Sequence, residues 1–143
     1  MKTLSQFRMQ QALDLVREVA EATAEATKES EKTRETYRNL CNEFPVLVRT
    51  CGLCQAIAFC VDKAQSDEDA RAEAYRLLLT HIGKILGVET DGNGGANDRL
   101  LNKILGADTT EYMLYTRRVL QAWVYFKRFA VSVLGVKTGG SES

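Results

Sequence analysis

The cysteines are the most reactive side chains in this chain of 143 residues. Cys51 and Cys54 form a CxxC pair, but the pair lies inside an apolar stretch that predicts a helix. Redox motifs gain their low thiol pKa at a turn between a strand and a helix, which is absent here. Together with Cys41 and Cys60, the pair also lacks the repeated CxxC spacing of a structural zinc site. We therefore expect small buried thiols that pack in a core, and no metal ion or other cofactor.

His81 is the only histidine in the chain. It is expected in the last turn of a helix, where a partly positive imidazole would face unpaired carbonyl groups. No base then remains to activate a nucleophile. Paired carboxylates fall only in predicted helix caps and in faces of alternating charge, where dipole compensation and ion pairing account for them without acid–base catalysis. The sequence therefore predicts a protein that is not an enzyme and takes no small-molecule substrate.

Basic side chains are the remaining candidates. From Tyr112 to the end of the last predicted helix there are four basic residues and no acidic one, namely Arg117, Arg118, Lys127 and Arg128. Arg49 and Arg38 could extend this basic arc. In one hypothesis the arc follows a phosphate backbone, so RNA affinity would fall steeply with salt. In the other, the apolar excess of the last helix and the polar arm of the first are protein interfaces, and the charges only maintain solubility.

Composition limits both the fold and the partners. Nineteen basic and nineteen acidic residues cancel, so any nucleic-acid binding must come from local patches. A single proline and the lack of alternating apolar and polar runs predict an all-α fold. The length fits one domain, which we place at residues 1–137, with a disordered tail at 138–143. No stretch resembles a signal peptide or could span a bilayer, so we expect a cytoplasmic protein.

The elements that must position these residues are predicted to form a bundle of about five helices around a central apolar helix. That helix covers residues 44–64, where only Arg49, Thr50 and Gln55 are clearly polar between positions 46 and 61. Pro45 suits its first turn, since a proline there loses no hydrogen bond. Arg49 is thus expected either to contact RNA or to bond to a helix end or a buried carboxylate.

One helix, straight or bent, is predicted over the first forty residues, because they contain neither glycine nor proline. Thr3 and Gln6 form a capping box at its start. Its segment 25–38 is almost wholly polar, and is expected to be a solvated face, a frayed linker or a partner surface.

The later helices are predicted from caps and stops. The first of them is expected to start at a capping box from Ser66 to Asp69 and to end near Leu86 and Gly87. A short helix is expected at 98–105, before Gly106. The last helix is expected to start at a capping box from Asp108 to Glu111 and to end near Leu134. The glycine-rich loop at 88–96 has neither the preceding strand nor the spacing of a phosphate-binding loop.

Two blocks of sequence resemble the signatures of a known family. FPVLVR at 44–49, followed by GLCQAIAF at 52–59, is similar to the first signature of the small helical subunit of the type III-B CRISPR effector, the Cmr complex. Residues 115–130, with WVYFKRFA at 123–130, resemble its second signature, and the blocks follow in the same order. Cys51 stands where the family often has an asparagine.

This resemblance implies a non-catalytic structural subunit in antiviral defence. Such subunits stack head to tail into a short filament with other Cmr subunits, beside the guide RNA, and help form the groove for target RNA. Arg49, Lys127 and Arg128 match basic positions of the signatures, and Arg38 matches a Tyr-Arg pair of the family. Arg117 and Arg118 join the expected RNA-binding residues on charge alone. The alternative is a helical adaptor or regulator that binds only protein.

Overall fold

The computed structural model describes residues 1–66, 69–88 and 94–135. Within these ranges the chain forms six helices and no strand: α1 (Leu4–Ala22), α2 (Lys28–Cys51), α3 (Leu53–Ser66), α4 (Ala70–Leu86), α5 (Gly94–Leu105) and α6 (Thr109–Phe129). A π-helical turn, η1 (Ala130–Leu134), continues α6. The predicted all-α class is confirmed. In the described part of the chain, no helix combines the length and apolar character needed to cross a membrane.

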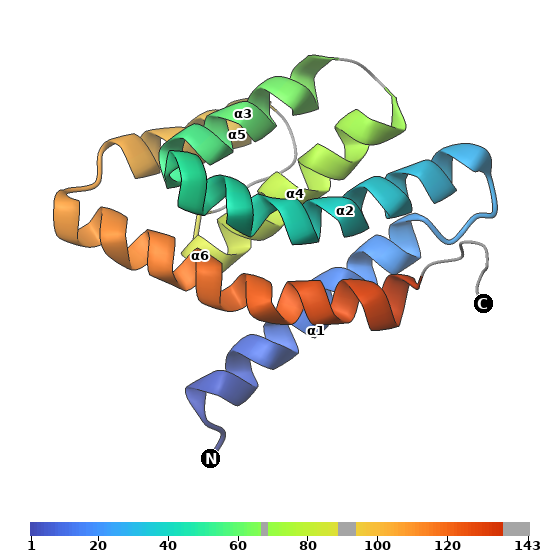
Figure 1. Cartoon of the computed structure of the whole chain (residues 1–143), viewed down its shortest axis with the longest axis horizontal. Coiled ribbons are helices and arrows are strands. Elements are labelled where there is room, and N and C mark those ends of the chain that lie inside the picture. Colours follow the sequence, from blue (N-terminus) through green and yellow to red (C-terminus); the bar gives the residue numbers. More distant parts are fainter. Residues whose placement is uncertain (67–68, 89–93, 136–143) are drawn as a thin grey trace.

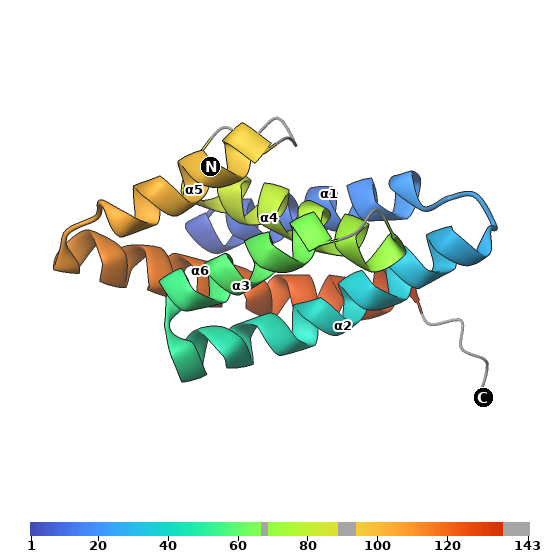
Figure 2. The same cartoon turned by 90° about the horizontal axis from the view of Figure 1, so that it is seen from above.

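The helices are arranged so that α2 and α6 share one face although they are far apart in the sequence. They lie side by side at the front of Figure 1, and the second view shows α1 and α4 behind them (Figure 2). α4 contacts α2, α3 and α6, and α1 packs against α6 and η1. α3 packs on α2 and α4, while α5 packs on α3.

The predicted central helix over 44–64 is in fact two helices, because the chain turns at Gly52. This glycine has φ 89° and ψ 159°, a conformation that is essentially restricted to glycine. Tyr112 of α6 closes the turn, because its hydroxyl oxygen accepts a hydrogen bond from the Cys54 N–H at 3.0 Å and so does for α3 what an N-cap side chain does. Pro45 consequently lies inside α2, not in the first turn of a helix.

The first forty residues also form two helices instead of one. The capping box of Thr3 and Gln6 is confirmed, but α1 ends at Ala22, and α2 begins after its own N-cap, Thr27. Residues 25–27 of the polar segment 25–38 connect α1 to α2, whereas the rest of the segment is helical and is not wholly solvated. Its Thr33 and Tyr37 are buried, and the Thr33 hydroxyl donates a hydrogen bond to the carbonyl at the start of α4. An apolar stripe therefore continues through the charged segment.

The other predicted helix limits are partly confirmed. The capping box of Asp108 and Glu111 is present, and Gly87 ends α4 in the left-handed conformation. The box predicted from Ser66 is wrong, because α3 runs to Ser66 and Asp69 alone caps α4. α5 begins at Gly94, inside the loop predicted over 88–96. The other loop residues from 89 to 93 and the tail predicted at 138–143 lie outside the described residues.

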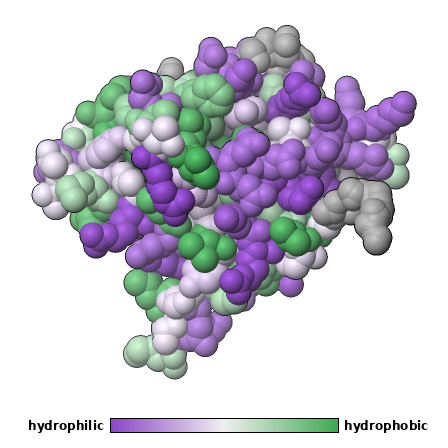
Figure 3. Space-filling model, viewed as in Figure 1, coloured by the Kyte–Doolittle hydropathy of each residue, from purple (hydrophilic) through white to green (hydrophobic). Residues whose placement is uncertain are grey.

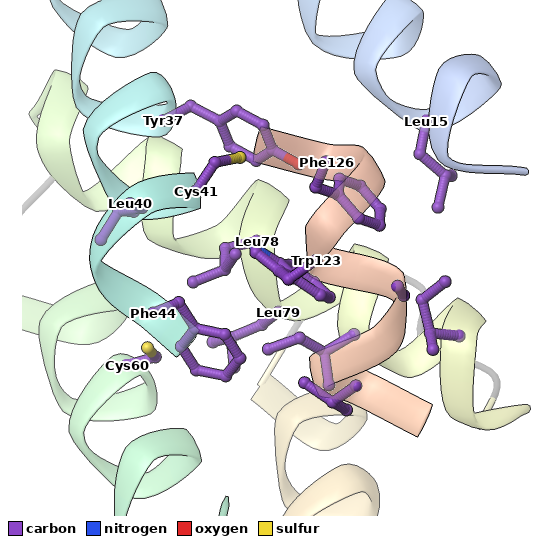
Figure 4. Close-up of a cluster of buried hydrophobic side chains, with 14 of the residues drawn as sticks. Leu15, Tyr37, Leu40, Cys41, Phe44, Cys60, Leu78, Leu79, Trp123 and Phe126 are labelled. Carbon is purple, nitrogen blue, oxygen red and sulfur yellow. The ribbon is translucent and has the colours of Figure 1, made fainter. Parts of the chain in front are cut away.

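Five rings packed against one another connect α2, α4 and α6 in the core. The ring centroids are 5.3 Å apart for Phe44 and Trp123, 4.2 Å for Trp123 and Phe126, 6.0 Å for Phe126 and His81, and 5.6 Å for His81 and Tyr37. Figure 4 shows the α2 and α6 members of this aromatic chain converging over leucines of α4. All five side chains are buried. The aromatic chain thus fixes how α2 and α6 lie relative to each other.

The prediction of a partly positive His81 in the last turn of a helix is wrong. His81 is a buried core residue. Its Nδ1 lies 2.7 Å from the Tyr37 hydroxyl oxygen, and burial, followed by the nearby charge of Lys84, lowers the pKa of His81 to about 3. Burial raises the pKa of Tyr37 well above its ordinary value, so the phenol keeps its proton and can donate it to Nδ1. The nearest oxygen of Glu18 is 3.7 Å from Nε2, too far for a hydrogen bond.

Replacing Gly52 with alanine should lower the free energy of unfolding by about 1–3 kcal/mol, the usual strain of a side chain in this conformation. The new Cβ would also lie 3.2 Å from the Tyr112 hydroxyl oxygen. Urea unfolding followed by circular dichroism measures the loss. The exposed neighbour provides the control, since Cys51→Ala should change stability by less than about 0.5 kcal/mol. Equal stability of G52A and C51A would show that the turn imposes no backbone restriction.

The buried imidazole should make stability depend on pH. In the unfolded chain the pKa of His81 returns to its ordinary 6.5, so below that pH the unfolded state takes up a proton that the folded state refuses until about pH 3. This contribution is complete above the unfolded pKa and falls by about 1.4 kcal/mol per pH unit as pH decreases between the two values. Unfolding free energies near neutral pH and about two pH units lower, compared between wild type and His81→Phe, isolate it. Identical pH slopes for the two proteins would contradict the prediction.

Candidate nucleic-acid interface

A shallow groove with a volume of about 360 Å³ runs between the second half of α2 and α6. Its floor is apolar, with Trp123 of the core beneath it, and is formed by Val46, Leu120, Val124 and Val131. Three of the predicted RNA-binding residues line it, Arg49 from α2 and Lys127 and Arg128 from α6. We call this feature the basic groove.

The positions of the three cations follow from the packing beneath them. Phe44 of α2 contacts Trp123 of α6 in the core, and each helix carries its cations about one turn further along. Arg49 lies in the last turn of α2, and Lys127 and Arg128 lie in the last turn of α6. The partly negative carboxyl end of α2 favours a positive side chain, so Arg49 is accommodated there without a carboxylate.

The cations of the basic groove have no electrostatic partner among the described residues. Arg49, Lys127 and Arg128 are exposed, and none of them makes a hydrogen bond or ion pair with any described residue. Each retains its full set of N–H donors, and no acidic side chain lines the groove. Such a surface can bind an anion that brings several oxygens, such as a phosphate backbone or a row of carboxylates.

The other three predicted residues lie outside the basic groove. Arg38 is half-buried on α2, and Arg117 is exposed on α6. Each is eleven residues, or about three helical turns, before a cation of the groove, so it shares a helix face with Arg49 or Arg128 respectively. Arg118 faces away from them, in a separate groove between α1, α4 and α6 that it lines with Arg8 and Lys84.

Arg34 is a structural arginine that the sequence interpretation missed. Its half-buried guanidinium donates hydrogen bonds to the Ala20 and Thr23 carbonyl oxygens at the end of α1, both at 3.4 Å, and to the Leu134 carbonyl oxygen at the end of η1, at 3.3 Å. It also bonds to the Thr23 hydroxyl at 3.1 Å. The bonding to a helix end that was one alternative for Arg49 is therefore found at Arg34. The only sequence signal was its position next to Thr33 and Tyr37, which continue the apolar stripe of α2.

The cysteines have different environments. Cys41 and Cys60 are buried core residues, and burial raises the pKa of each thiol to about 12. Cys51 is exposed, so the prediction of a buried thiol is wrong there, because the turn at Gly52 brings it to the surface. No group of three or more histidine, cysteine or acidic side chains in the described ranges is placed to hold a metal ion.

Comparison with known proteins gives consistent matches over almost the whole chain. A family model described as CRISPR-associated protein (Cas_Cmr5) matches residues 4–133. The CRISPR system Cmr subunit Cmr5 of Thermus thermophilus is 31% identical over 134 residues, which cover 94% of this chain and 98% of that protein. The X-ray crystal structure of a CRISPR-associated Cmr5 family protein from Thermus thermophilus is similar with a TM-score of 0.66 and 32% identity, covering 93% of this chain and 98% of that one.

Alanine substitutions should separate the structural arginine from the cations of the basic groove. Arg34→Ala leaves carbonyl groups at two helix ends without donors, and should destabilise the fold by about 2–3 kcal/mol. Arg49→Ala removes no bond to any described residue, and should change stability by less than about 0.5 kcal/mol. Thermal and urea unfolding of the two variants measures the difference. A loss of stability in R49A equal to that in R34A would mean that Arg49 supports the fold.

Proposed function

The chain belongs to the family of CRISPR-associated Cmr5 proteins, and on this basis we propose that it is a non-catalytic structural subunit of a type III-B CRISPR effector, the Cmr complex. It assembles with the other Cmr subunits and with copies of itself into a short filament. Its basic groove forms part of the surface along which target RNA lies, beside the guide RNA. In this role it contributes shape and charge to antiviral defence, and cleavage belongs to other subunits.

The observation that carries the RNA proposal is the convergence on one groove of three cations that have no partner in the part of the chain that the structure describes. Arg49 comes from one family signature, and Lys127 and Arg128 come from the other, and they meet only because α2 and α6 pack side by side. A phosphate backbone supplies negative charge at regular intervals and binds such a row without loss of any bond inside the protein. Arg38 and Arg117, on the same helix faces, extend the row along the RNA.

The groove suits sequence-independent binding. Its charged groups are arginine and lysine side chains, which bind phosphate oxygens but carry no sequence information in such contacts. In RNA-guided complexes, base pairing with the guide reads the sequence of the target. The lining of the groove also includes no histidine or carboxylate, the side chains that most often act as a general base. This chemistry supports holding RNA, not cleaving it.

One observation favours the alternative of a protein-binding adaptor. The floor of the basic groove exposes the apolar side chains of Val46, Val124 and Val131, which a phosphate backbone would not cover. A helix from a neighbouring subunit with acidic and apolar residues would cover them and neutralise the cations at the same time. In that case the charges would serve subunit docking, and RNA binding would not depend on them.

The salt dependence of RNA binding distinguishes the RNA-groove proposal from the adaptor alternative. In a reconstituted Cmr complex loaded with guide RNA, R49A/K127A should weaken target RNA binding. It should also reduce the slope of log Kd against log salt by about 0.7 for each phosphate group that the variant no longer neutralises. The change is measured by fluorescence anisotropy with a non-cleavable target.

The matched control removes two exposed cations that also lack partners among the described residues but lie on other surfaces. The double variant R17A/K32A makes the same change in net charge and should leave the slope unchanged. If both double variants reduce the slope equally, the effect is one of net charge and not of the groove. An unchanged slope in R49A/K127A, in a complex that still assembles, would refute the RNA-groove proposal. Failure of that variant to enter the complex would favour the adaptor function.

A further inference from the structure

Helices α2 and α6 run antiparallel on either side of the basic groove. In Figure 1 α2 runs from right to left, whereas α6 runs from left to right. Three contacts between the two segments give their register, in the order Cys54–Tyr112, Phe44–Trp123 and Arg34–Leu134. From each contact to the next, the chain moves ten residues back on the α2 side and eleven residues forward on the α6 side. The register is therefore regular along the whole groove.

This register places four of the predicted RNA-binding arginines in two pairs. Arg49 and Arg117 each lie five residues from the first contact, so they are level with each other at one end of the groove. Arg38 and Arg128 lie six and five residues from the second contact, toward the third, so they are level at the other end. Lys127 stands beside the second pair. On each helix eleven residues separate the two pairs, which is about 16 Å at the rise of an α-helix.

The donors of these four arginines are available to a ligand. Each side chain is exposed or half-buried, and none makes a hydrogen bond or ion pair with another described residue. Glu35 is exposed one turn before Arg38 on α2, so the positive surface of that helix ends beyond the second pair. The charge on this face is thus concentrated at two places.

The surface between the two pairs is apolar. Val46, Leu120 and Val124 form the floor of the groove there, and the two valines are 58% and 53% exposed. Figure 3 views this face and shows apolar side chains exposed between hydrophilic ones. A uniform row of phosphate contacts would leave this floor in water, which is unfavourable. The ribose and base of a nucleotide have carbon-rich surfaces that can cover it.

We propose that the basic groove holds RNA through two separate phosphate subsites, Arg49 with Arg117 and Arg38 with Arg128, and that the nucleosides between them lie on the apolar floor. The inference rests on the proposed RNA function and divides its groove into parts. Along one stacked strand a phosphate follows about every 3.4 Å. The phosphates at the two subsites therefore belong to the same strand and lie about five nucleotides apart, and the strand runs along the helices and not across them.

Neutral linkages in the target RNA test the two subsites. In the reconstituted Cmr complex loaded with guide RNA, a methylphosphonate linkage removes one negative charge at a chosen position of a non-cleavable target. Fluorescence anisotropy should show binding about tenfold weaker at two positions about five nucleotides apart for each copy of the chain, with little effect between them. The variant R49A/R117A should abolish the sensitivity at one of these positions, and R38A/R128A at the other.

The apolar floor has a test of its own. The double variant V46T/V124T keeps the shape of the floor but adds two hydroxyl groups. It should weaken target binding and leave the slope of log Kd against log salt unchanged, because no phosphate contact is lost. The control R17A/K32A should give the same pattern of sensitive linkages as wild type. Circular dichroism should show that all these variants fold.

The possible results separate this inference from the proposed function. If neutral linkages weaken binding over one uninterrupted run of positions, or if V46T/V124T binds as tightly as wild type, the division into subsites and floor is wrong while RNA binding by the groove stands. If both arginine double variants leave the pattern of sensitive linkages unchanged, in complexes that still assemble, the groove does not contact the target RNA. The proposed function then fails together with this inference.

Discussion

The contact between α2 and α6 through buried aromatic rings is the interaction on which the rest of this structure depends. Phe44 and Tyr37 of α2 reach Trp123 and Phe126 of α6, with His81 of α4 completing the chain of rings. Rings of this size bury large areas and pack in a few preferred geometries, so they determine the spacing of the helices more narrowly than aliphatic contacts do. The surface above them inherits that spacing. The distance between the cations of α2 and those of α6 is therefore a property of the core.

Arg34 and Arg49 show two different uses of an arginine in this chain. Arg34 lies between the ends of α1 and η1, and its donors are used by carbonyl groups that would otherwise lack partners. Arg49 lies on the side of α2 away from the core, and its donors are unused within the described chain. Arg34 stabilises the fold, because unpaired carbonyl groups near the interior are costly. Arg49 is expected to contribute little to the stability of the fold, so its side chain is available to a partner.

The basic groove combines cations with an exposed apolar floor. Phosphate oxygens can bind the cations but would leave Val46, Val124 and Val131 exposed, whereas a protein helix with acidic and apolar residues would cover both. The RNA proposal and the adaptor alternative therefore make different chemical demands on the same groove.

Local sequence was enough to predict the helical class, the capping boxes of α1 and α6, the stop at Gly87 and the apolar face of α6, because each of these depends on neighbours within a few residues. The resemblance of two blocks of sequence also pointed to the cations that line the basic groove. The turn at Gly52 depends instead on tertiary contacts, since a helix and a turn are both compatible with that apolar stretch until Tyr112 supplies the hydrogen bond from another helix. The same holds for His81, which is neutral because of its surroundings, and for Arg34, whose acceptors come from helix ends far away in the sequence. Local patterns specify elements, whereas burial and distant hydrogen-bond partners specify what each polar side chain does.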